Sequence, residues 1–250
     1  MSRYFLSTRS AYYAVVASLP LLVFYEALLA LSDSGLEGQV RNAADVWLRT
    51  VLVSLGVSPF HSTLAMIFIL LLAIPLLRHR SEPLEGRYLG MMFLESLLYG
   101  FFLGIVINYI LYFFFTLAVP VIGQINSPML AMPANIGLAQ GLALSLGAGL
   151  FEEFFFRVIL LSAMLYLARL MLAEWLAVAV AIVGAAFLFS LAHYIGPLGE
   201  PLEIHSFLFR WVAGLLFTIL YFLRGFAVTA YAHAFYDIFV ITGIFRIVGW

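Results

Sequence analysis

Seven stretches of the sequence are apolar enough and long enough to cross a lipid bilayer as helices. A hydrocarbon core of about 30 Å requires about 20 apolar residues at a rise of about 1.5 Å per residue. The stretches comprise residues 11–31, 61–77, 88–119, 138–168, 173–195, 207–223 and 226–245. Backbone polar groups that cross lipid must be satisfied within the segment, so these stretches are predicted to be helical. We therefore expect an all-α membrane protein, a polytopic bundle of about seven transmembrane helices, with residues 1–250 forming a single integral membrane domain.

The composition of the chain agrees with this class. Of the 250 residues, 65% are hydrophobic and 10% are charged, which is far from the composition of a soluble domain. The first stretch follows Arg3 and Arg9 and is longer than the core of a signal peptide, so we expect an uncleaved first span. Residues 32–60 mix charges with moderate hydrophobicity, which indicates a loop with an interfacial helix. Residues 120–137 are rich in proline and uncharged, which indicates a turn-rich loop against the membrane surface.

The distribution of arginine gives an orientation, because short loops rich in arginine remain in the cytoplasm. A cytoplasmic N-terminus places seven arginines on the cytoplasmic side and four on the far side. The first group is Arg3, Arg9, Arg78, Arg80, Arg87, Arg169 and Arg224, and the second is Arg41, Arg49, Arg210 and Arg246. We expect an integral protein of a prokaryotic cytoplasmic membrane with its N-terminus in the cytoplasm.

Charge and cysteine content exclude several classes of function. The net charge is −1, which provides no basic field for nucleic acid. The chain has no cysteine, which excludes disulfides, thiolate metal sites and cysteine nucleophiles. Nothing in the sequence specifies an oligomeric state.

The segment FEEFFFR, residues 151–157, places three ionisable side chains in an apolar stretch. A charge at the bilayer centre costs at least ~2.5 to 3.5 kcal/mol, so each needs a partner or a task. Glu153 and Arg157 are four residues apart on a helix, which predicts an ion pair. Glu152 lies about 100° around the helix from Glu153 and is left without this partner. It is therefore a candidate general base, although a buried ion pair with one protonated glutamate that holds helices together is an alternative.

Two later segments place further polar side chains at helical spacing. FSLAH puts Phe189 and His193 on one face, and HAFYD puts His233 and Asp237 on one face. A single intramembrane histidine is more often a hydrogen-bonded packing residue than a catalytic one. Three such clusters on three predicted spans favour a shared site over independent packing roles.

These three segments resemble the motifs of the CAAX prenyl protease and bacteriocin-processing (CPBP) family of intramembrane proteases, which are EExxxR, FxxxH and HxxxN or HxxxD. The resemblance covers about residues 138–245, the expected catalytic core, and not residues 1–137. It implies that Glu152 and His193 activate a water molecule and that His233 and Asp237 stabilise the oxyanion. Glu153, Arg157 and Phe189 would support them.

The family resemblance also implies a substrate and a cofactor requirement. The substrate would be a membrane-anchored or lipidated polypeptide in the bilayer, and no metal would be required. One departure is Asp237, where the prenyl proteases usually have asparagine. An ionised aspartate cannot donate a hydrogen bond to an oxyanion, so Asp237 must be protonated or must orient His233.

Three alternatives remain open from the sequence. Glu152, His193, His233 and Asp237 are residue types that suit a catalytic zinc site, although no HExxH motif is present. A transporter or proton relay would use Glu26 and Glu95 as well, although the chain shows no two related halves. A catalytically idle scaffold or immunity protein would keep the same fold without activity.

The predicted depths of the motif residues in the membrane, measured from the nearest predicted turn, do not agree. Glu152 lies ~26 Å from Arg169 and His193 lies ~28 Å from Glu174, both measured along the helix from the same predicted turn. His233 lies only ~14 Å from Arg224. Either the last hairpin begins inside the protein, or the spans tilt differently, or one boundary is wrong.

Overall fold

A computed structural model describes residues 3–32, 40–78, 83–122, 137–196 and 199–247, and in these ranges the chain is helical and contains no strand. The helices before residue 137 are α1 (Arg3–Thr8), α2 (Ala11–Leu31), α4 (Ala43–Ser54), η1 (Pro59–His61), α5 (Ser62–Arg78) and α6 (Gly86–Ile122). The later ones are α7 (Leu138–Gly147), η2 (Ala148–Glu152), η3 (Phe154–Leu161), α8 (Ser162–Arg169), α9 (Glu174–Ala192), α10 (Ile204–Arg224), α11 (Phe226–Ile241) and α12 (Ile244–Ile247).

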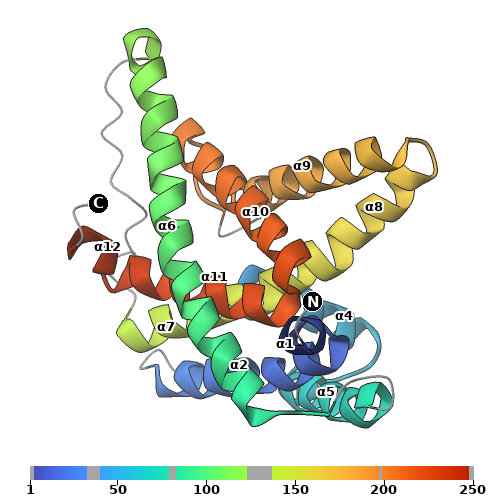
Figure 1. Ribbon diagram of the computed structural model, residues 1–250. Coiled ribbons are helices and arrows are strands. Elements are labelled where there is room, and N and C mark those ends of the chain that lie inside the picture. The colour runs from blue at the N-terminus through green and yellow to red at the C-terminus, as the bar shows by residue number, and fades with distance from the viewer. Residues whose placement is uncertain (1–2, 33–39, 79–82, 123–136, 197–198, 248–250) are drawn as a thin grey trace.

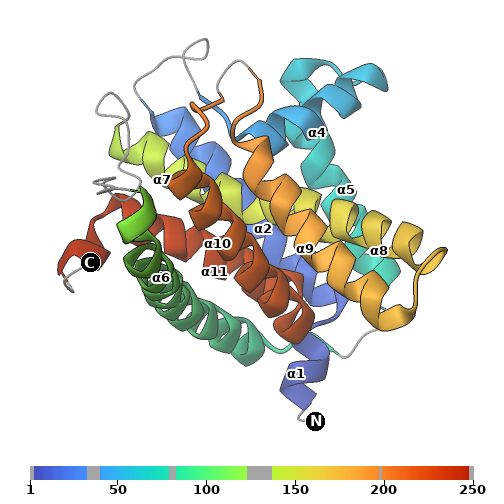
Figure 2. The same cartoon turned by 90° about the horizontal axis from the view of Figure 1, so that it is seen from above.

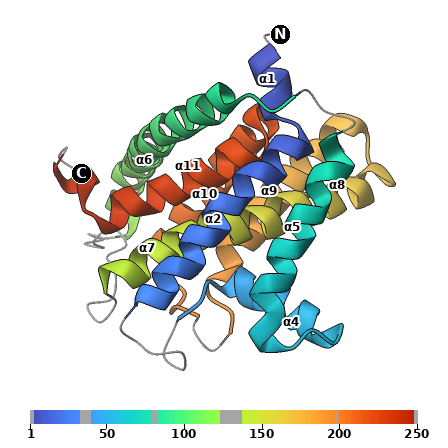
Figure 3. The same ribbon diagram turned by 90° about the horizontal axis from the view of Figure 1, so that it is seen from below.

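All seven predicted apolar stretches are helical, and the described residues include five helices long and apolar enough to cross a membrane. These five are Ala11–Leu31, Pro59–Arg78, Gly86–Phe114, Glu174–Ala192 and Ile204–Arg224. The stretch predicted at 138–168 is a run of four consecutive elements, α7, η2, η3 and α8. The seventh predicted stretch, at 226–245, contains the shorter helix α11. The interfacial helix predicted within 32–60 corresponds to α4, which lies crosswise at one end of α5 (Figures 2 and 3). Most of the loop predicted at 120–137 lies outside the described residues.

Helix α11 lies in the middle of the bundle, with α6 along one side and α2 and α7 near it (Figures 1 and 3). Ala230 and Ala232 on α11 are completely buried. The helix that precedes it, α10, ends at Arg224, whose side chain is also buried and is paired with Glu95 of α6. The last hairpin therefore begins inside the protein, which explains why His233 lies fewer residues from its turn than Glu152 and His193 do from theirs.

Small residues allow α11 to approach its neighbours closely. A Cβ atom on Gly149 of η2 would lie 2.3 Å from the carbonyl oxygen of Ala230, and one on Gly100 of α6 would lie 2.7 Å from that of Ala232. Neither glycine could carry a side chain without moving the α11 backbone. Close packing at small residues is the usual way in which membrane helices associate. Here it brings residues 151–157, which we call the EE segment after Glu152 and Glu153, against the helix that carries His233.

The outward faces of the helices are apolar. Helix α5, for example, exposes Leu64, Phe68, Leu72 and Leu76, and none of these is less than 49% exposed. An exposed apolar face of this extent would be unstable in water and is suited to lipid. The chain is an integral membrane protein on this evidence and on that of its helix lengths.

Candidate active site

The EE segment lies within an irregular part of the helical run from Leu138 to Arg169. Residues Ala148–Glu152 and Phe154–Leu161 are π-helical, and Glu153 lies at their junction. π-Helical turns are rare and occur frequently at functional sites. They place Glu152 on the side of a large cavity and Glu153 in the protein interior, where its side chain is 0% exposed.

Glu153 lies between two basic side chains. Its Oε1 atom lies 3.0 Å from Nη1 of Arg157 and 2.7 Å from Nδ1 of His233 on α11. The pair with Arg157 is the one that the four-residue spacing predicts. The contact with His233 connects two motifs across two helices, and sequence spacing did not reveal it. Because a carboxylate accepts hydrogen bonds, Nδ1 of His233 carries the hydrogen in this contact.

Phe189 and Phe217 enclose these charges. The guanidinium of Arg157 lies over the ring of Phe189 at 4.6 Å, a cation–π contact, and the ring of His193 lies 5.0 Å from the same ring. Phe217 of α10 stacks on His233, with ring centroids 4.7 Å apart and an interplanar angle of 23°. Phe189 was predicted as a supporting residue, and Phe217 had no signal in the sequence beyond its apolar character.

Glu152 and His193 face each other. Oε2 of Glu152 lies 4.0 Å from Nε2 of His193, which is longer than a hydrogen bond. Nδ1 of His193 lies 2.9 Å from the carbonyl oxygen of Phe189 and donates to it. In the neutral ring Nε2 is then an acceptor that points toward Glu152. The two side chains are 14% and 25% exposed, so both are accessible from the cavity.

Asp237 lies one helical turn after His233, as its spacing predicts. Its Oδ2 atom is 3.8 Å from Nε2 of His233, so the two are adjacent but not directly hydrogen-bonded. The Asp237 side chain is 29% exposed, whereas that of His233 is 6% exposed. Asp237 therefore faces the cavity more openly than the histidine does.

One cavity of about 410 Å³ contains all four residues predicted to be catalytic, Glu152, His193, His233 and Asp237. Its lining also includes Asn42, which donates a hydrogen bond of 2.7 Å from Nδ2 to Oε1 of Glu152. Asparagine before an apolar helical stretch is a recognisable N-cap signal, but nothing in the sequence places residue 42 beside residue 152.

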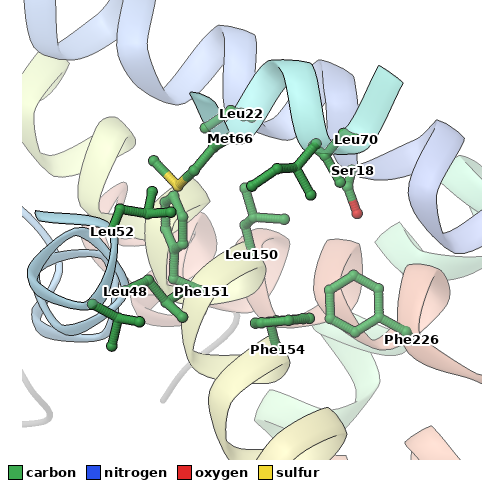
Figure 4. A pocket seen from close by; sticks show the side chains of 12 residues that line it. Ser18, Leu22, Leu48, Leu52, Met66, Leu70, Leu150, Phe151, Phe154 and Phe226 are labelled. Atoms are coloured by element: carbon green, nitrogen blue, oxygen red, sulfur yellow. The ribbon is translucent and has the colours of Figure 1, made fainter. Parts of the chain in front are cut away.

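A second cavity, of about 250 Å³, lies among α2, α4, α5 and the same helical run (Figure 4). Leu150, Phe151 and Phe154 face it, and Phe226 closes one side. Among the described residues that line it, the one polar side chain is that of Ser18, whose hydroxyl already donates to the carbonyl of Ala14. The cavity therefore offers an environment for an apolar group and none for acid–base chemistry.

The two other glutamates considered for a proton pathway lie in separate ion-pair clusters. Glu26 is paired with Arg41 and Arg49, and Glu95 is paired with Arg224 and accepts a hydrogen bond from Tyr4. Glu26 reaches the cavity only through Arg41, which lines it, and among the described contacts neither glutamate touches Glu152, His193, His233 or Asp237. Within the described ranges, no group of three or more His, Cys, Asp or Glu side chains is arranged to hold a metal ion.

Residues 134–239 match the family model described as type II CAAX prenyl endopeptidase Rce1-like. The matched region contains all three motifs and every predicted catalytic residue, but not Asn42. Comparisons with curated proteins and with solved structures find no match. The members of the matched family are intramembrane endopeptidases. The match supports the assignment of this chain to the CAAX-type (CPBP) intramembrane proteases, and with it the chain is a membrane-embedded peptide-bond hydrolase.

Proposed function

We propose that this protein is a glutamate-type endopeptidase that cleaves membrane-anchored or lipidated polypeptides without a required metal. The observation that carries the proposal is the opposition of Oε2 of Glu152 and Nε2 of His193 across 4.0 Å, inside the cavity that also contains His233 and Asp237. Two acceptor atoms at this separation suit one water molecule that donates a hydrogen to each.

The water so held is the nucleophile. Its oxygen attacks the scissile carbonyl carbon, one of its protons passes to Glu152, and the carbonyl oxygen becomes an oxyanion. Collapse of the tetrahedral intermediate breaks the C–N bond, and Glu152 returns the proton to the leaving amine nitrogen. Glu152 thus serves first as general base and then as general acid, while His193 orients the water.

His233 supplies the stabilisation of the oxyanion. Because Nδ1 donates to Glu153, a second donor bond from Nε2 requires the doubly protonated ring. The positive charge of that ring and of Arg157 is balanced by Glu152 and Glu153, so the cluster is neutral when Asp237 is protonated. A protonated Asp237 adds a second donor beside Nε2, which is the role of an oxyanion hole.

The apolar cavity supports a substrate with a lipid or other apolar anchor. A peptide held at the catalytic cavity and an anchor held in the apolar cavity would lie on two faces of the same helix, since Phe151 faces one and Glu152 the other. Burial of an apolar chain is favourable by roughly 25 cal/mol per Å². Such binding would raise the local concentration of the peptide at Glu152.

The zinc hypothesis is the alternative that uses the same residues, and one assay separates the two. The protein is purified in detergent and in liposomes, and the cleavage of a lipid-anchored peptide is followed by mass spectrometry with and without a chelator. Metal-free catalysis predicts an unchanged rate after the chelator. Loss of cleavage that added zinc restores would overturn the glutamate-type proposal.

A further inference from the structure

Asn42 is the direct hydrogen-bond partner of Glu152. It is 8% exposed and lies at the N-cap of α4, 110 residues before Glu152 and outside the region that matches the family. We propose that Asn42 is a positioning residue of the active site, which holds the carboxylate of Glu152 so that Oε2 faces His193. The inference rests on the proposed role of Glu152 as the base.

The orientation of the Asn42 amide is determined by its second contact. Its Oδ1 atom accepts a hydrogen bond of 2.9 Å from the backbone N–H of Ala44, the capping bond of α4. A backbone N–H can only donate, so the atom that faces Ala44 must be the oxygen. The NH2 group is therefore the part of the amide that faces Glu152, and it can only donate.

This bond decides which oxygen of Glu152 is available for chemistry. The terminal torsion of a glutamate is soft, and a carboxylate without a fixed partner rotates over a broad range. The donor at 2.7 Å holds Oε1 and leaves Oε2 directed at Nε2 of His193. Without the donor, Oε2 of Glu152 would no longer be held in place as an acceptor for the water. The rate of the chemical step, and with it kcat, would fall.

Asn42 is itself held from behind by α2. The hydroxyl of Tyr25 accepts from the backbone N–H of Asn42 at 3.4 Å and donates to Asp45 at 2.9 Å. A Cβ atom on Gly147 would lie 2.6 Å from the Tyr25 ring and 3.2 Å from Cβ of Asn42. Gly147 therefore lets Tyr25 and Asn42 come close to the helix that carries Glu152.

A charged cluster completes the anchor. Asp45 is fully buried and is paired with Arg41 at 3.1 Å and Arg49 at 2.7 Å, and both arginines also contact Glu26 of α2. Burial alone would lower the pKa of Arg41, but its hydrogen bonds to and attraction by Glu26 raise the pKa above its ordinary value. Arg41 therefore stays charged, and the ion pairs of the cluster fix the start of α4 against α2.

The test separates positioning from helix capping. Asn42→Ser and Asn42→Asp keep a good N-cap residue but remove the amide donor, and Asn42→Ala removes both. Ser10→Ala is the matched control, because Ser10 caps α2 and has no contact with the cavity among the described residues. The readouts are kcat, KM and the thermal midpoint, with a lipid-anchored peptide as substrate.

We expect all three Asn42 variants to lose about 10- to 100-fold in kcat, the range for a hydrogen bond to a charged group, with KM within about twofold. The thermal midpoint should fall for Asn42→Ala and Ser10→Ala, and Ser10→Ala should keep its kcat. Wild-type kcat in Asn42→Ser and Asn42→Asp would overturn the inference, as would a change confined to KM.

A parallel Glu152→Gln variant distinguishes the two proposals. If it is inactive while Asn42→Ser and Asn42→Asp are fully active, only the role of Asn42 fails. If Glu152→Gln keeps its activity, the proposed function fails whatever the Asn42 variants show.

Discussion

Nδ1 of His233 lies 2.7 Å from Oε1 of Glu153, so the second carboxylate of the EE pair is bonded to a histidine on another helix. Glu153 is fully buried, whereas Glu152, its neighbour in sequence, opens into the cavity. The two glutamates therefore have different tasks. Glu153 contacts both His233 and Arg157, and in the proposed mechanism Glu152 is left to bind the water.

Arg157→Ala is predicted to destabilise the protein. It removes the cation 3.0 Å from Glu153 and the cation–π contact with Phe189, which leaves a buried carboxylate with His233 alone. Breaking a buried ion pair by removal of one partner costs about 3 to 5 kcal/mol. The thermal midpoint and the yield of folded protein measure the effect. The control is Arg169→Ala, whose side chain is exposed; equal midpoints for the two variants would contradict the pairing.

Gly149→Ala is predicted to separate the EE segment from α11. The added Cβ would lie 2.3 Å from the carbonyl oxygen of Ala230 and 2.8 Å from Cβ of Ala234. Overpacking of this kind typically costs about 1 to 3 kcal/mol. The thermal midpoint and kcat should both fall. Gly90→Ala has open space around it and should be as stable as the wild type or more stable. An unaffected Gly149→Ala protein would show that this close approach is not needed.

Leu70→Trp is predicted to reduce selectivity for lipid-anchored substrates. Leu70 lines the apolar cavity, and a larger ring would fill part of its 250 Å³ (Figure 4). KM for a lipid-anchored peptide should rise at least about tenfold, since a mismatch of even one methylene group in an apolar pocket changes discrimination by about 10- to 200-fold. The same peptide without a lipid should be cleaved at the wild-type rate. Leu71→Trp, at a position 51% exposed on the outside of α5, is the control. Equal losses with both peptides would remove the apolar cavity from the binding site.

Asp237 can be tested by the dependence of the cleavage rate on pH. An aspartic acid donates to the oxyanion only when protonated, whereas the asparagine of Asp237→Asn donates at every pH. The wild-type rate should therefore fall as the pH rises through the ionisation of Asp237, and the rate of Asp237→Asn should not show this fall. Asp237→Ala should be slow throughout. If the Asn variant is as inactive as the Ala variant, the donor role is wrong and a metal-ligand role gains support.

Local spacing predicted those parts of the site that lie within one helix. The four-residue separations of Glu153 from Arg157 and of His233 from Asp237 gave pairs that the structure contains. Contacts between helices were not predictable in this way. The bond from Asn42 to Glu152 spans 110 residues, and in its own segment Asn42 is an ordinary N-cap residue.

Several of the arginines used to predict the membrane orientation form ion pairs inside the protein. Arg224 was counted as a loop residue on the cytoplasmic side, but it is buried and paired with Glu95. Arg41, Arg49 and Arg210 are likewise held by carboxylates, namely Glu26, Asp45 and Glu200. An arginine that completes an ion pair is retained for that pair, so its position reports less about membrane orientation than an unpaired loop arginine does.

The central claim is that Glu152 moves the proton of the attacking water, and Glu152→Gln tests it most directly. Glutamine has nearly the same shape but is not a base at any accessible pH. The measurement is the initial rate of cleavage of a lipid-anchored peptide by the purified variant, with its thermal midpoint as a check of folding and Glu174→Gln, an exposed glutamate at the α8–α9 turn, as the matched control. We predict that Glu152→Gln folds normally and cleaves at less than about one per cent of the wild-type rate, because general base catalysis contributes about 10²- to 10⁴-fold. A folded Glu152→Gln protein that cleaves as fast as Glu174→Gln would contradict the mechanism.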